Sequence, residues 1–308
     1  MPQNLITESE LSKIERVKDM ILTPTQYLKS SFVEGEQKKS QSDLCGLYTY
    51  HLKNKSRQEI YYFGSRHSND PADPMFTEIK KAFVAVRPDI VLVEGCEGIN
   101  LNKASVIEKG KKEADVTSLI CCGGESHYTL KLAVDAGVDF ESPEPDLKDE
   151  IAYLEEKGFE RDAVFAFYVF RQLNQYTREK PQQDSTKAQK SISQYLETLF
   201  YELQSATKWE GFEYSVEHVQ RVGRTFWKHE LDFIDPKVPI QYVDPIPWPD
   251  SLDSYTKINE VAAVSSMFRD RYIVGRVAEN LKEHKKIFIV YGSAHAVVEE
   301  PALREIMR

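Results

Sequence analysis

Cysteine is scarce in this sequence, and it does not form a metal or disulfide framework. The chain of 308 residues contains four cysteines, of which Cys121 and Cys122 are adjacent, and no two are spaced as C-x-x-C. This spacing excludes the paired motifs of a zinc ribbon. A chain of this length can also bury a core without disulfide cross-links. We therefore expect reduced thiols, and we expect Cys121 and Cys122 to be packing residues because no neighbouring group marks an activated thiolate.

Long apolar runs are also missing. No run approaches the roughly 18 residues that a membrane-spanning helix needs. The N-terminal stretch MPQNLITESELSKIERVKDM has no apolar segment like that of a secretory signal. We therefore expect a cytoplasmic protein that does not enter a membrane. The formal net charge of −9 argues against non-specific nucleic-acid binding, which normally requires a basic surface.

The common nucleotide and hydrolase motifs are absent as well. The sequence contains no G-x-G-x-x-G, no G-x-x-x-x-G-K-[ST], no G-x-S-x-G and no H-E-x-x-H. The sequence therefore gives no support for a dinucleotide-binding or phosphate-loop protein, for a serine hydrolase with a nucleophile elbow, or for a zinc protease of the commonest type.

What the sequence does contain is an alternation of apolar strands and amphipathic helices. Residues 46–64 alternate in polarity and turn at Lys53–Arg57, which is typical of a β-hairpin. A helical pattern between Met75 and Val86 then leads into the apolar run DIVLVEG at 89–95. Strand, helix and strand in this order predict parallel strands. We predict an α/β fold with a mostly parallel central sheet flanked by helices and an N-terminal β-hairpin.

The same patterns divide the chain into parts. Three helical stretches separated by polar segments follow the first strands, and we interpret them as a helical insert. After them, IQYVDPIPW at 240–248 and KIFIVYG at 286–292 predict two further strands. The expected organisation is a single α/β domain over 1–308, with a core at 46–146 and 240–308, the insert at about 147–235 and an N-terminal helical extension at 1–40.

Two copies of a short motif each follow a predicted strand. The motif reads Gly-Ser-Arg-His at 64–67 and Gly-Ser-Ala-His at 292–295. Ligands of open α/β sheets bind outside the carboxyl ends of the strands. His67, His295 and the strand-end Glu94 are therefore expected to lie together. Two imidazoles with carboxylates are typical of a divalent metal site or of an acid–base pair.

Each candidate residue also has a simpler structural interpretation. A strand-end histidine is often only a hydrogen-bonded structural residue, and Glu94 is equally consistent with a solvated loop or a helix cap. Glu125 starts a predicted helix, where a carboxylate favours the helix dipole. A solvated loop is also the default for the carboxylates around two prolines, namely Glu141, Glu144 and Asp146. At least one of the helix arginines Arg269 and Arg271 is expected to be an ordinary solvated charge, while the other could reach the site and bind a carboxylate or an oxyanion.

Four stretches together resemble the TraB/PrgY/GumN group, the superfamily that also includes Tiki, erythromycin esterase and ChaN-like proteins. LYTYHLKNKSRQEIYYFGSRHS and IFIVYGSAHAVV are similar to its two G-x-x-H motifs. PDIVLVEG is similar to its P-D-x-V-x-x-E strand, and MFRDRYIVGRVAENL to its R-N-x-x-M helix. The resemblance covers about 46–146 and 240–308, and the helical insert matches no motif of the family. Asp270 stands where the family usually has Asn, and Ile273 where it usually has Met.

The resemblance implies a set of site residues and several functions. Members include metal-dependent proteases, an esterase that opens macrolide lactones, and haem-binding lipoproteins, so the fold alone does not choose the function. Our first hypothesis is a hydrolase of amide or ester bonds that uses a divalent metal (Mn, Co or Zn). The matching positions imply metal ligands at His67, His295, Glu94 and Glu144, and catalytic roles for Glu94, Arg269 and Glu125.

Two alternatives remain open at this point. The first is a metal-independent esterase in which His67 acts as a general base paired with Glu94. The second is a regulatory protein or a carrier of haem or another small molecule, in which a tyrosine of the insert, such as Tyr168 or Tyr195, supplies an axial ligand. The expected partner is a small-molecule or peptide substrate, with no nucleic acid and no membrane. The sequence does not specify an oligomeric state.

Overall fold

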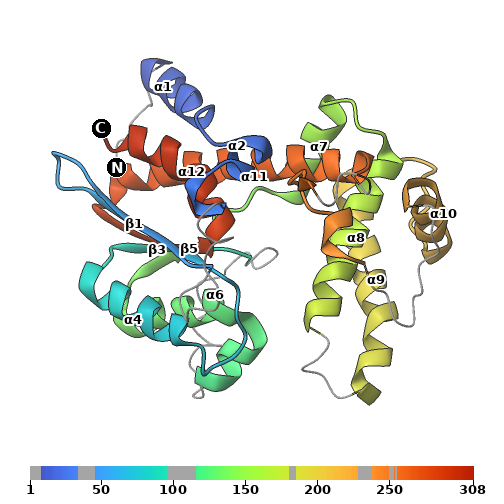
Figure 1. The fold of residues 1–308 in the computed structure, drawn as a ribbon, viewed down its shortest axis with the longest axis horizontal. Coiled ribbons are helices and arrows are strands. Elements are labelled where there is room, and N and C mark those ends of the chain that lie inside the picture. The colour runs from blue at the N-terminus through green and yellow to red at the C-terminus, as the bar shows by residue number, and fades with distance from the viewer. Residues whose placement is uncertain are drawn as a thin grey trace. The chain divides into compact units, whose positions relative to one another are not determined.

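The computed structural model describes most of the chain, namely residues 8–33, 46–95, 116–179, 185–227, 238–249, 253 and 255–308. Parts of the predicted N-terminal extension and helical insert lie outside these ranges. The chain forms two compact units (Figure 1). One unit consists of Met1–Glu144 together with Asp270–Arg308, and the other consists of Pro145–Arg269.

The first unit is built on a five-stranded sheet in the order β1-β2-β5-β3-β4. β1 and β2 form the predicted antiparallel hairpin, whereas β2, β5, β3 and β4 are parallel neighbours. The predicted α/β class, with a mostly parallel sheet, is therefore confirmed. The strand bounds are β1 (Tyr48–Lys53), β2 (Glu59–Ser65), β3 (Ile90–Val93), β4 (Asp139–Glu141) and β5 (Lys286–Gly292).

Helices cover both faces of this sheet (Figure 1). Side chains alternate along each strand, so the buried strands supply apolar residues to two layers. Val91 and Phe288 belong to the core beneath α4 and α6, while the neighbouring Leu92 and Ile289 are fully buried as well. One face carries α4 (Pro74–Val86) and α6 (Val116–Ala136), and the other carries α12 (Ser293–Ile306), on which α1 (Glu8–Lys18) and α2 (Pro24–Leu28) pack.

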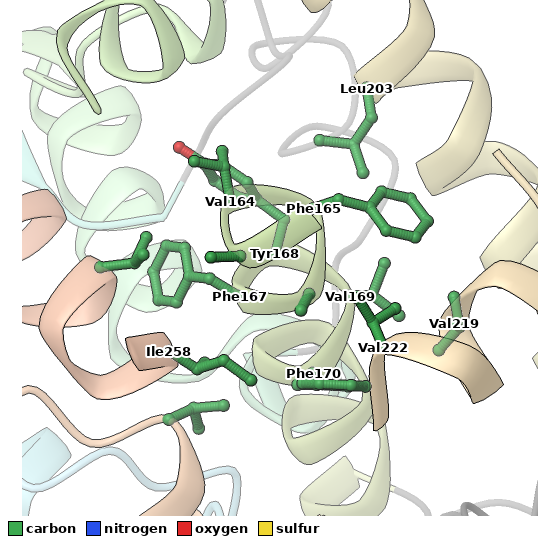
Figure 2. Packing of buried hydrophobic residues seen from close by; sticks show 14 of the residues in the cluster. Val164, Phe165, Phe167, Tyr168, Val169, Phe170, Leu203, Val219, Val222 and Ile258 are labelled. Atoms are coloured by element: carbon green, nitrogen blue, oxygen red, sulfur yellow. The ribbon is translucent and has the colours of Figure 1, made fainter. Parts of the chain in front are cut away.

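The second unit is a helical bundle centred on α8 (Arg161–Glu179). Residues 163–170 of this helix are buried without interruption, so apolar side chains on every side of the helix pack into the core (Figure 2). The helical stretches predicted here are helices wherever the structure describes them. The other helices of the unit are α7 (Leu147–Glu156), α9 (Ser185–Thr207), α10 (Val216–Trp227) and the first part of α11 (Lys257–Glu283).

The prediction of a strand at 240–248 is wrong. This segment forms a short 3-10 helix at Ile240–Tyr242 followed by a loop, and it groups with the helical unit. Proline stands at every second position after Asp244, and proline cannot donate to a strand ladder. The loop is held instead by the Asp244 carboxylate, which accepts hydrogen bonds from the Ile246 N–H and from Nε1 of Trp248.

None of the helices in the described ranges combines the length and the apolar character needed to cross a membrane.

Candidate functional site

The carboxyl ends of the parallel strands bring three predicted site residues together. His67 follows β2, Glu94 follows β3, and His295 lies in the first turn of α12 directly after β5. Oε1 of Glu94 lies 3.6 Å from Nε2 of His295, and Oε2 lies 4.0 Å from Nε2 of His67. The Glu94 carboxylate also accepts a 2.7 Å hydrogen bond from the N–H of Gly292. Both imidazoles therefore face one anchored carboxylate.

The two G-S-x-H motifs lie on neighbouring strands but in different registers. The pairing of β2 with β5 places Ser65 opposite Gly292, so the copies are offset by one residue. Each glycine permits a different close approach. A Cβ on Gly64 would lie 2.9 Å from Cα of Ser293, whereas a Cβ on Gly292 would lie 2.7 Å from Nε2 of His67. The first glycine therefore admits helix α12, and the second admits the ring of His67.

A buried carboxylate orients the ring of His67. Nδ1 of His67 lies 2.6 Å from Oε1 of Glu125, and Oγ of Ser65 donates to the same oxygen at 2.7 Å. Because an ionised carboxylate only accepts hydrogen bonds, Nδ1 carries the hydrogen and Nε2 is left facing Glu94. Burial alone would raise the pKa of Glu125, but the hydrogen bond and charge of His67 outweigh it and hold that pKa below its usual value. The side chain of His67 itself is 53% exposed.

Local backbone geometry places the two members of this pair. His67 has a φ of 55°, in the left-handed region that few non-glycine residues adopt. Helix α6 is interrupted at Gly124, whose φ of 54° and ψ of −144° suit only glycine. A Cβ on Gly124 would lie 2.8 Å from Oδ1 of Asn69, in the loop that carries His67. Glu125 thus begins a new helical segment directly against that loop.

A second buried carboxylate orients His295. Nδ1 of His295 lies 2.5 Å from Oδ1 of Asp270 on α11, and Asp270 is 2% exposed. A further carboxyl group, Glu299, lies one helical turn along α12, with Oε1 3.9 Å from the same Nδ1. Tyr62 on β2 donates a 3.1 Å hydrogen bond to Oε2 of Glu299. Burial, followed by the charge of Asp270, raises the pKa of Glu299 well above its ordinary value.

Asp270 and Glu299 were not predicted as site residues. Asp270 was noted only as a departure from the resembling family. The i, i+4 spacing of His295 and Glu299 on a predicted helix was a signal that could have identified Glu299. Nothing in the sequence around Asp270 pointed to His295, because the two residues come from different elements.

Three further candidates, Glu144, Glu141 and Arg269, each lie in a different environment. Glu144 is close enough to Glu299 for its charge to raise the pKa of that group. Glu141 instead accepts hydrogen bonds from Nε of Arg276 and Nδ2 of Asn280. Arg269 is buried and belongs to the helical unit, so its role in stabilising negative charge stays a prediction.

The predicted metal ligands do not form a ready-made site for one ion. Zinc bound at about 2.0–2.2 Å in a tetrahedron separates its ligand atoms by about 3.3 Å. In the described part of the chain, the group whose candidate ligand atoms all lie within 4.8 Å of one another is Asp270, His295 and Glu299. It lacks His67, Glu94 and Glu144, and its histidine nitrogen is already paired with Asp270. A divalent metal therefore stays a prediction.

No family model, curated protein or solved structure matches the chain. The resemblance to the TraB/PrgY/GumN group stays a prediction.

Proposed function

We propose that this chain is a hydrolase of amide or ester bonds that works by general acid–base catalysis. A single arrangement carries the proposal. His67 and His295 each direct Nδ1 to a buried carboxylate, Glu125 or Asp270, and both direct Nε2 toward Glu94. A carboxylate on Nδ1 fixes the ring and its tautomer and stabilises the charged imidazolium, which is what a catalytic base requires.

His67 is the base in this proposal because its ring is the more exposed of the two. Its Nε2 takes a proton from water while the water oxygen forms a bond to the substrate carbonyl carbon. The bond to the leaving oxygen or nitrogen then breaks, and the leaving atom receives a proton from an imidazolium. Glu125 stays ionised throughout, since its pKa is lowered, and it stabilises the charged ring of His67.

The test is hydrolysis of a panel of p-nitrophenyl esters and chromogenic peptide amides, with and without chelator. We expect His67→Ala to lower the rate by about 10²–10⁴-fold. The matched control is His51→Ala, because His51 lies on the surface of the β-hairpin and pairs with Glu59 at 2.9 Å. A wild-type protein that hydrolyses nothing in the panel, or full activity in His67→Ala, would overturn the proposal.

A metal-dependent hydrolase is the second candidate. Both imidazole Nε2 atoms stand 3.6–4.0 Å from Glu94. These distances are too long for a hydrogen bond but close to the separation of about 3.3 Å between two ligand atoms on one zinc ion. The measurement is the metal content of the wild type, His67→Ala and His295→Ala. Bound metal that both variants lose, together with activity abolished by chelator, would favour this candidate over the metal-free version.

A further inference from the structure

A second carboxyl group lies behind the pair formed by His295 and Asp270, and the reaction proposed above makes no use of it. Glu299 is fully buried in α12, one turn beyond His295. The polar groups around it come from separate elements, namely Tyr62 on β2 and Asp270 on α11. This polar cluster sits in the apolar layer between α12 and the sheet, where each group needs a partner.

The carboxyl groups of Glu299 and Asp270 lie close together and are both buried. Their oxygens lie within 4.8 Å of each other, and like charges this close in a dry site favour a shared proton. Asp270 accepts from Nδ1 of His295, so it already acts as a hydrogen-bond acceptor on that side. A hydrogen bond between the two carboxyl groups would therefore have Glu299 as its donor.

The hydrogen bonds of Glu299 agree with this assignment. Oε2 accepts from the hydroxyl of Tyr62, whereas Oε1 is buried and receives no hydrogen bond from any donor in the described residues. An oxygen in that position is satisfied if it carries a hydrogen and donates it. The acceptor toward which it can donate is the carboxylate of Asp270, with which it interacts.

We propose that Glu299 is a positioning residue that donates a hydrogen bond to Asp270 and thereby holds Asp270 against Nδ1 of His295. In the resulting hydrogen-bond network, Tyr62 donates to Glu299 and Glu299 donates to Asp270. His295 donates to Asp270 from the other side. Asp270 accepts from both sides, so it cannot rotate away from the histidine. The role of this hydrogen-bond network in turnover rests on the proposed hydrolase function, but the geometry of the network does not.

The variants Glu299→Gln and Glu299→Leu test whether the hydrogen bond donated to Asp270 is what matters, rather than the charge or the volume of the side chain at position 299. Glu299→Gln keeps a neutral donor toward Asp270, and Glu299→Leu keeps volume but removes the donor. The readout is the proton resonance of His295 Nδ1–H, assigned by its loss in His295→Gln. We expect a far-downfield resonance in the wild type and in Glu299→Gln, and an upfield shift or loss in Glu299→Leu.

The adjacent Glu300→Gln is the matched control, because Glu300 bonds Tyr48 and Arg304 rather than Asp270. It should leave the resonance unchanged. Loss of the resonance in Glu299→Gln, with circular dichroism showing a folded chain, would overturn the proposal, because charge rather than donation would then be required. So would an unchanged resonance in Glu299→Leu.

Turnover gives the second readout. Where the wild type hydrolyses a substrate, Glu299→Leu should lower kcat by about tenfold or more with little change in KM, and Glu299→Gln should restore most of the loss. If the wild type hydrolyses nothing but the resonance pattern holds, the proposed function fails while the positioning role stands.

Discussion

Replacing each motif glycine with alanine should separate a structural role from a role in the site. In Gly64→Ala, the new methyl group would lie 2.5 Å from the carbonyl oxygen of Tyr48 and 2.9 Å from Cα of Ser293. Both are backbone atoms, so β1 or α12 would have to move. In Gly292→Ala, the methyl group would lie 2.7 Å from Nε2 of His67, at the end of a half-exposed side chain that can rotate away.

The two magnitudes follow from these contacts. Overpacking costs about 1–3 kcal/mol, and collision with two backbone segments puts Gly64→Ala at about 3 kcal/mol. For a unit of this size, that loss lowers Tm by roughly 6–12 °C. Gly292 has an ordinary extended backbone, with φ −55° and ψ 145°, so alanine gains about 0.4–1 kcal/mol through the unfolded state. Displacement of the His67 ring offsets that gain, and Tm should change by less than about 3 °C.

The assay combines thermal unfolding by circular dichroism with the rate of hydrolysis. Gly292→Ala should keep its Tm but lose about tenfold to 100-fold in rate, because the base is displaced. Gly275→Ala is the control, since its methyl group would meet only the flexible end of Lys18. A Gly64→Ala variant that melts with the wild type would refute the reasoning, as would a larger fall in Tm for Gly292→Ala.

Two further predictions concern pH and the helical unit. Glu125→Gln removes a carboxylate whose pKa is lowered, because the hydrogen bond and charge of His67 outweigh the opposing effect of burial. Its stabilisation is present above the unfolded value of 4.5 and is lost as pH falls through the lowered pKa. The wild type should therefore exceed the variant in urea midpoint near neutral pH and converge with it in acid, and a constant difference would contradict this. Phe170→Ala removes a fully buried ring and should cost about 3–5 kcal/mol in denaturant unfolding. Tyr201→Ala, at a side chain that is 71% exposed, should cost less than about 0.5 kcal/mol.

The meeting of His67, Glu94 and His295 was predictable from the sequence for a general reason. Apolar runs mark the strands, and the carboxyl ends of parallel strands share one end of a sheet. Residues directly after such runs therefore share one edge of the sheet, and those that follow neighbouring strands lie close together. The hairpin and the parallel sheet were predictable as well, because polarity alternation and turn residues are local signals.

The order of the strands and the partners of the histidines were not predictable in this way. The offset that places Ser65 opposite Gly292 depends on long-range pairing. Glu125 and Asp270 reach the histidines from other elements, and no spacing in the sequence encodes that contact. The segment at 240–248 was misassigned because apolar residues in a proline-rich loop imitate a strand when hydrogen bonding is not considered.

The position of β5 has a consequence for the order in which the protein matures. β5 is the central strand, between β2 and β3, yet it is the last strand in the chain. During synthesis, the β-hairpin and β3 emerge long before the strand that joins them, and the continuous segment Pro145–Arg269 precedes it as well. Pairing across such a sequence separation is slow, and it leaves strand edges open until it occurs. Because β5 also leads directly into His295, insertion of this strand completes the sheet and the site in one step, and a nascent chain without it has neither.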